Sequence, residues 1–218
     1  MQKSWGSRFA PGTFLLVAGI ALCAALPGPG AAPPPKPQAA DPPPGDLLIA
    51  ADTMGDPRFS HAVILILSHD ADGALGIVIN RPLEEKPIAD ILAAAASSKD
   101  REPDPDINGT IRVFAGGPVQ PERGFVVHTT DYKGERTLTV PNIVAMTPTT
   151  GVLRDIGHHK GPAKYFFALG YAGWGPGQLD DEIKHHDWFS TPGDPKLIFD
   201  DDRDDLWKHA LARRTQDL

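Results

Sequence analysis

Short apolar runs separated by turn-forming residues dominate the chain after residue 46, and most of them predict β-strands. Leu47–Ala50 is a short apolar run, and Val63–Ser68 is a continuous one rich in β-branched residues, which is typical of a strand buried on both faces. Ala74–Asn80 follows a turn-forming Asp-Ala-Asp-Gly segment, so residues 63–80 predict a hairpin. Further strands are predicted at Ile111–Ala115, Phe125–Thr129, Thr137–Val140, Ile143–Met146, Lys164–Gly170 and Lys196–Phe199.

Helical spacing of apolar residues occurs in several places between these strands. Ile88, Ile91 and Leu92 follow an i, i+3, i+4 pattern, which predicts a helix over residues 88–96. Further helices are predicted from Thr149 or Thr150 as a cap to Ile156, from Pro176 to about His185, and from Arg203 to Arg213. Residues 97–109 read as a surface loop and Gly170–Gly177 as a glycine-rich turn. Without a strict βαβ repeat, this order favours an α+β or mixed α/β domain.

The first 45 residues differ from the rest. Lys3 and Arg8 precede the apolar run TFLLVAGIALCAAL, which is the layout of a signal peptide, so residues 1–26 predict an exported or membrane-tethered protein. Residues 12–26 are the segment that would form the tether, although the run is short for a transmembrane helix. The alternative is a mis-assigned start codon, which would make the protein cytoplasmic. Residues 27–45 form a Pro/Ala/Gly-rich linker, and 46–218 form the domain.

Length and charge narrow the function classes. The chain has 218 residues and a formal net charge of −7. That length suits one domain with an appendage. Lys3, Arg8 and Lys36 outnumber Asp41 in residues 1–45, so the negative charge resides in the domain. This balance argues against nucleic acid as a partner. The only cysteine, Cys23, excludes an intramolecular disulfide and a multi-cysteine zinc site.

Four ordered motifs carry a resemblance to a known family. They are Met54–Phe59 followed by VILILSH, Gly76–Pro82, Gly116–Val119, and the string LGYAGWGPGQL at 169–179. In this order they resemble the bacterial YqgE/AlgH family over roughly residues 46–213. Glu182 and Trp188 fit the segment after the last motif.

The resemblance implies a compact α+β domain with a mixed, largely antiparallel sheet flanked by helices. It implies a protein that is usually cytoplasmic and whose family has no settled molecular function, although one member's name reflects a proposed role in regulating alginate genes. It supplies no catalytic residues. Two departures stand out: the leader and linker are additional, and Gly151 replaces an acidic residue near the start of a helix.

Three segments supply candidate ligand-binding residues. Arg81, next to Asn80 at a strand end, could hold an anion, or could pair with a carboxylate such as Asp56. Gly116 and Gly117 could present backbone N–H groups as an anion nest, or could simply form a turn. The glycine-rich turn offers the remaining candidates, Gly173, Trp174, Gly175 and Gln178. A strand, glycines and then a helix can cradle a phosphate, but Asp180 and Asp181 in the first helical turn oppose that, so close packing is the alternative.

Known catalytic and metal-binding patterns are missing from the sequence. There is no G-x-S-x-G elbow, no H-E-x-x-H and no EF-hand loop. No cofactor and no metal is therefore expected. We expect a non-enzymatic binding or regulatory module whose partner is a protein or a small anionic ligand. The alternatives are a transcriptional regulator with a direct or indirect link to DNA and an enzyme acting on an anionic small molecule.

Overall fold

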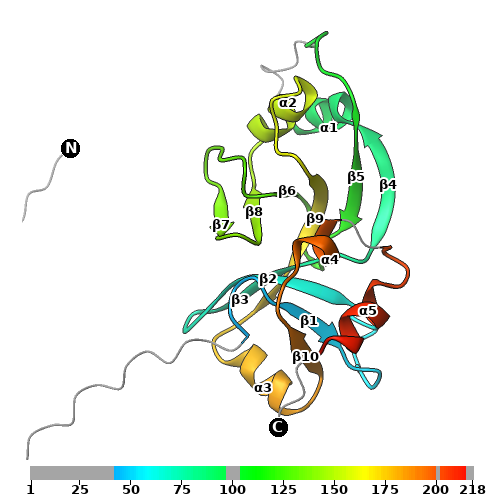
Figure 1. Cartoon of the computed structure of the whole chain (residues 1–218), viewed down its shortest axis with the longest axis vertical. Coiled ribbons are helices and arrows are strands. Elements are labelled where there is room, and N and C mark those ends of the chain that lie inside the picture. Colours follow the sequence, from blue (N-terminus) through cyan, green and yellow to red (C-terminus); the bar gives the residue numbers. More distant parts are fainter. Residues whose placement is uncertain (1–41, 97–103, 200–201, 215–218) are drawn as a thin grey trace, which may run out of the picture. The chain divides into compact units, whose positions relative to one another are not determined.

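The computed structural model describes residues 42–96, 104–199 and 202–214 (Figure 1). The predicted leader and most of the predicted linker lie outside the described residues, as do residues 97–103 of the predicted loop. The strands are β1 (Leu47–Ala50), β2 (Val63–Asp70), β3 (Gly73–Val78), β4 (Pro82–Pro87), β5 (Thr110–Ala115), β6 (Val119–His128), β7 (Leu138–Val140), β8 (Val144–Thr147), β9 (Tyr165–Trp174) and β10 (Trp188–Thr191). The helices are α1 (Ile88–Ala95), α2 (Gly151–Gly157), α3 (Gln178–Lys184), α4 (Pro195–Phe199) and α5 (Leu206–Ala212).

The strands form one mixed, largely antiparallel sheet. Its order is β10-β1-β2-β3-β9-β6-β8-β7, and β5 pairs with both β9 and the edge strand β4. The β5–β9 pair is parallel, and the other pairs are antiparallel. The α+β class is therefore confirmed, and the predicted 63–80 hairpin is the β2–β3 pair.

Strand β9 joins the parts of this sheet, because it pairs with β3, β5 and β6 (Figure 1). Small residues make this convergence possible. A Cβ on Gly170, whose φ is +72°, would lie 2.3 Å from the carbonyl oxygen of Gly117. A Cβ on Gly116 would lie 2.5 Å from the carbonyl oxygen of Gly170. Two backbones approach here more closely than any side chain allows.

Three apolar clusters cover the faces of the sheet. Alternate residues of β1 belong to different clusters: Leu47 and Ile49 pack with α4 and α5, and Leu48 and Ala50 pack with α3. The third cluster joins α1 and α2 to β5, β6 and β9, with Phe167 of β9 among its members. Burial on both faces explains why these strands read as continuous apolar runs.

Several predicted elements differ from the structure. Lys196–Phe199 was expected as a strand but belongs to α4, because Asp194 Oδ1 accepts the N–H of Lys196 at 2.9 Å and Pro195 begins the helix. The predicted turn Gly170–Gly177 is wrong over its first half, since Gly170–Trp174 continue β9. Strands β4 and β10 were not expected, and α5 begins at Leu206 rather than Arg203.

The described chain begins inside the predicted linker, and these first residues contact the domain. The carbonyl of Pro42 lies 3.0 Å from Nδ1 of the buried His69, and the N–H of Gly45 donates to the carbonyl of Ile66 at 2.7 Å. Among the helices described here, none is long and apolar enough to cross a bilayer. Residues 12–26, the predicted tether, lie outside the described residues.

Candidate functional site

Asn80 and Arg81 contact the segment that leads into β2. Asn80 Oδ1 accepts the N–H of Val63 at 2.9 Å, and its Nδ2 donates to the carbonyl of His61 at 2.8 Å. Arg81 Nη2 donates to the carbonyl of Ser60. Asp56, which was considered as a partner for Arg81, pairs with Arg58 instead. Both candidates therefore hold the backbone of residues 60–63.

Gly116 and Gly117 lie where β5 meets β9. The N–H of Gly116 donates to the carbonyl of Leu169 at 2.7 Å, and its carbonyl accepts the N–H of Val78 at 2.8 Å. The N–H of Gly116 is therefore engaged within the protein and does not contribute to an anion nest. A Cβ on Gly117 would lie 2.1 Å from the carbonyl carbon of Tyr171, so this position supports close packing.

The remaining candidates lie together at the start of α3. Gly173 and Trp174 end β9, and residues 175–177 form the turn into the helix. The side chain of Gln178 closes this turn, because its Oε1 accepts the N–H of Gly175 at 3.1 Å. The N–H of Gly175 is therefore bound within the turn and is not directed at a ligand.

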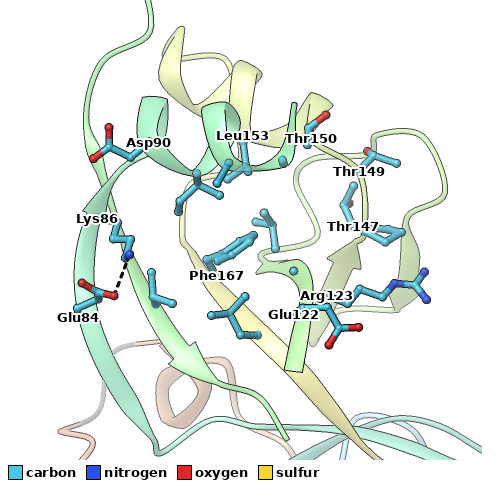
Figure 2. Close-up of a pocket in the computed structure, with 18 residues that line it drawn as sticks. Glu84, Lys86, Asp90, Glu122, Arg123, Thr147, Thr149, Thr150, Leu153 and Phe167 are labelled. Carbon is cyan, nitrogen blue, oxygen red and sulfur yellow. Dashed lines mark ion pairs between the residues drawn. The ribbon is translucent and has the colours of Figure 1, made fainter. Parts of the chain in front are cut away.

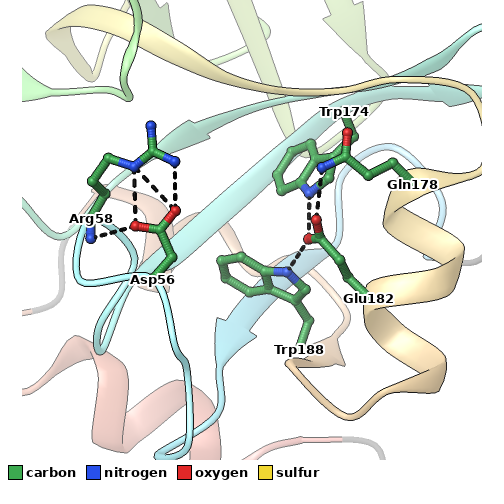
Figure 3. Close-up of polar contacts among 6 residues, drawn as sticks. All are labelled: Asp56, Arg58, Trp174, Gln178, Glu182 and Trp188. Atoms are coloured by element: carbon green, nitrogen blue, oxygen red, sulfur yellow. Dashed lines mark hydrogen bonds and ion pairs between the residues drawn. The ribbon is translucent and has the colours of Figure 1, made fainter.

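One carboxylate organises the side chains around this turn. Glu182 Oε2 accepts the indole N–H groups of Trp174 and Trp188, both at 2.8 Å (Figure 3). Its Oε1 accepts from Gln178 Nε2, also at 2.8 Å. Figure 3 shows that these side chains come from β9, α3 and β10 and point toward one another. Glu182 thus links two strands of the sheet to the helix that covers them.

A cavity of about 370 Å³ opens beside these residues, and we call it the indole pocket. It is lined by Met54, Gly55, Asp56, Arg58, Phe59, Pro118, Val119, Gly173, Trp174, Gln178, Glu182, Asp187 and Trp188. Asp56 and Arg58 form a forked pair in which Arg58 Nε donates to Oδ1 at 3.0 Å and Nη2 donates to Oδ2 at 2.6 Å (Figure 3). These hydrogen bonds from Arg58 lower the pKa of Asp56.

The sequence motifs contained the residues that reasoning about single segments missed. Asp56 and Arg58 lie in the Met54–Phe59 motif, while Glu182 and Trp188 follow the last motif. None of the four was selected as a candidate, because their convergence depends on the pairing of β10 with β1 and on the position of α3. The available signal was that a carboxylate and two indoles occur within fifteen residues of one another.

A second cavity, of about 410 Å³, lies between α1, α2 and the sheet, and we call it the apolar pocket (Figure 2). Phe167 and Leu153 lie in its interior, and Gly124 leaves room for the Phe167 ring, since a Cβ there would lie 2.1 Å from Phe167 Cζ. The ladder between β6 and β9 is irregular between Val119 and Gly124, and this irregularity places Glu122 and Arg123 at the edge of the cavity.

Some of the polar side chains around the apolar pocket are bound to other protein groups. Lys86 Nζ lies 3.1 Å from Glu84 Oε1, and Arg123 Nη1 donates to Gln120 Oε1 at 3.2 Å. Figure 2 shows the Arg123 side chain pointing away from Phe167. The wall of the cavity is largely apolar and includes Ile91, Val113, Leu153 and Phe167.

Thr147, at the wall of the apolar pocket, belongs to a buried network. His128 Nδ1 lies 2.8 Å from the carbonyl of Thr129 and Nε2 lies 2.9 Å from Thr147 Oγ1. A carbonyl only accepts, so Nδ1 carries the proton and Nε2 accepts from Thr147. Burial lowers the pKa of His128, which keeps the ring neutral. Among the described residues, no group of three or more His, Cys, Asp or Glu side chains is placed to hold a metal ion.

Comparison with known proteins identifies the family. The model of the AlgH-like family matches residues 47–218. The chain belongs to the AlgH-like family. A UPF0301 protein of Rhodospirillum rubrum is 46% identical over 169 residues, covering 78% of this chain and 85% of that protein. A UPF0301 protein of Afipia carboxidovorans is 41% identical over 177 residues, covering 80% and 84%. These names specify no activity.

Solved structures of similar proteins agree with the AlgH-like fold. The solution structure of the AlgH protein from Pseudomonas aeruginosa matches with a TM-score of 0.64 and 33% identity, covering 81% of this chain and 91% of that one. A crystal structure of a protein from Corynebacterium diphtheriae matches with a TM-score of 0.61 over 82% and 91% of the two chains. Its identity is 21%, so this second likeness shows the fold alone.

Proposed function

We propose that this AlgH-like chain is a non-enzymatic binding or regulatory module and that the indole pocket is its binding site. One observation carries the proposal: Glu182 gathers Trp174, Trp188 and Gln178 at the wall of a cavity of about 370 Å³. Ligand sites combine apolar and aromatic walls with a small number of fixed polar groups, and this cavity has that composition. The apolar pocket is slightly larger but lacks a comparable polar centre.

The chemistry of the pocket lining supports binding rather than catalysis. None of its lining residues, all of which the structure describes, carries a hydroxyl, a thiol or an imidazole group. The carboxylates of Asp56, Glu182 and Asp187 are therefore the only candidate bases in this lining. Asp56 is paired with Arg58 and Glu182 accepts three hydrogen bonds, so both carboxylates are already engaged by groups of the protein.

The charge of the site is consistent with a partner other than nucleic acid. Asp56, Glu182 and Asp187 outnumber Arg58 among the lining residues. A surface that neutralises phosphates needs the opposite balance. This supports the expectation that a protein or a small molecule, rather than DNA, occupies the site.

The indole N–H groups provide a direct test. We would record the tryptophan indole signals of the ¹⁵N-labelled chain by NMR while adding separated small-molecule and protein fractions of a host extract. We expect the signals of Trp174 and Trp188 to shift or broaden and that of Trp207, whose Nε1 donates to the carbonyl of Ala50, to stay in place. A partner that binds elsewhere without moving the two pocket signals would overturn the proposal, as would substrate turnover that depends on the pocket.

A further inference from the structure

The ionic contacts leave an excess of negative charge in the indole pocket. Arg58 is the only basic residue in the lining, and its guanidinium is bound to Asp56 through two of its nitrogen atoms. That pair is neutral as a whole. Glu182 and Asp187 remain, and both are only partly exposed. An anion entering the pocket would meet these two carboxylates with no free cation to offset them, whereas a cation would be attracted.

Glu182 also has hydrogen-bonding capacity that its protein partners do not use. An ionised carboxylate offers about four acceptor positions on its two oxygens. Oε2 accepts two indole N–H groups, and Oε1 accepts one N–H from Gln178. Oε1 therefore keeps room for one more donor. An ionised carboxylate only accepts hydrogen bonds, so the additional partner must be a donor.

Aromatic rings form the rest of the wall. Phe59 contacts Trp188 edge to face with centroids 5.6 Å apart, and Trp188 contacts Trp174 in the same way at 6.1 Å. Ring faces carry a negative potential that attracts cations. The protein already places one cation there, because the guanidinium carbon of Arg58 lies 5.9 Å from the centroid of the Phe59 ring.

We propose that the indole pocket binds a cationic N–H donor, an ammonium or guanidinium group, which donates to Glu182 Oε1 beside the aromatic wall. This inference rests on the proposed function of the pocket and specifies its ligand chemistry, which differs from that of the small anionic ligand, one of the two kinds of partner expected from the sequence. Such a group is presented either by a lysine or arginine side chain of a protein or by a free amine. The partly exposed Asp187 adds attraction at the same site.

The test uses four small probes of similar size on the full chain. n-Butylammonium and n-butylguanidinium carry the cation, butyrate carries the opposite charge, and n-butanol carries none. We expect the indole signals of Trp174 and Trp188 to shift saturably with the two cations and to respond weakly or not at all to butyrate and n-butanol. Blocked tripeptides with a central Lys or Arg then separate the sources, since tighter binding than the free amine indicates a protein side chain.

Matched variants separate pocket binding from general electrostatics. Glu182→Gln keeps an acceptor but removes the charge, and it should weaken cation binding by about tenfold or more, as expected for loss of a hydrogen bond to a charged group. Asp181→Asn makes the same charge change one residue away, on a side chain that is 68% exposed and pairs with Lys184, and should leave affinity unchanged. If Glu182→Gln fails to fold, Asp187→Asn serves in its place and should weaken binding by a smaller factor.

The outcomes distinguish this inference from the proposed function. Saturable shifts with butyrate or n-butanol and none with the cations would overturn the ligand class and leave the pocket as a binding site. Equal losses of affinity in Glu182→Gln and Asp181→Asn would show non-specific attraction and reject the inference. No response to any probe, including the host fractions, would reject both.

Discussion

Trp174 and Trp188 lie edge to face with ring centroids 6.1 Å apart, although they belong to strands at different places in the sheet. Both indoles donate to the same oxygen of Glu182. This arrangement fixes the position of α3 against the sheet, because the helix contributes the carboxylate and the strands contribute the donors. The residues of the proposed binding site therefore also contribute to the packing of α3 on the sheet.

Removing the carboxylate should destabilise the domain. Glu182→Ala leaves two buried indole N–H groups without an acceptor, and we expect a loss of about 2–4 kcal/mol in the free energy of unfolding. Glu182→Gln retains an acceptor and should lose less. Urea unfolding followed by circular dichroism measures both. Asp181→Ala, on the exposed side of the same helix, should be indistinguishable from wild type, and a large loss there would show that the effect is one of helix charge.

The glycines of the sequence motifs should differ sharply in their tolerance of substitution. In Gly117→Ala the new Cβ would lie 2.1 Å from a backbone carbon of Tyr171, so we expect a loss of about 3 kcal/mol or more, or no folded protein. In Gly175→Ala the nearest atom is Gln178 Oε1 at 3.9 Å, and stability should change by less than about 0.5 kcal/mol. Comparable melting temperatures for the two variants would contradict the packing described here.

His128 should make stability depend on pH in a defined direction. Burial lowers its pKa from 6.5, so the unfolded chain takes up a proton at higher pH than the folded one. Its contribution to stability is complete above about pH 6.5 and is lost as the pH falls toward the lower pKa of the folded state. Free energies of unfolding between pH 7.5 and pH 5.5 measure this loss.

A variant isolates the contribution of His128 from that of other titrating groups. His128→Asn should be less stable than wild type at pH 7.5, because the smaller side chain leaves space in a buried site. Its stability should vary less with pH than that of wild type over the same range. Parallel pH profiles for the two proteins would show that His128 does not carry the effect.

The N-terminal region gives a prediction about cellular location. The signal-peptide layout of residues 1–26 predicts that the protein is processed or held at the membrane, whereas a mis-assigned start predicts a cytoplasmic chain that begins near Asp46. Fractionation of the host followed by intact-mass and N-terminal analysis separates the two. Envelope location would exclude direct control of transcription by this chain, and a cytosolic chain starting near residue 46 would contradict export.

Much of the fold is readable from the sequence because strand burial is a local signal. Val63–Ser68 lies within β2, the predicted run Ala74–Asn80 overlaps β3 as far as Val78, and most residues of both strands are buried. Strand β4 gave no such signal: it begins and ends with proline and exposes most of its residues, which only an edge strand tolerates. The glycine-rich end of β9 gave a misleading signal. Its glycines predict a turn, but in the structure they allow close packing of strands.

Apolar periodicity and turn residues place most strands along the chain and limit the fold to an α+β or mixed α/β domain, because these signals act over a few positions, and the family motifs are read directly from the residues. Which motif residues meet is visible in the tertiary structure alone. It directs Asn80 and Arg81 to the backbone of residues 60–63 and brings Trp174, Trp188 and Glu182 together. The reason is physical: contacts between distant segments depend on how strands pair and how α3 packs on the sheet, and neither is encoded in local spacing.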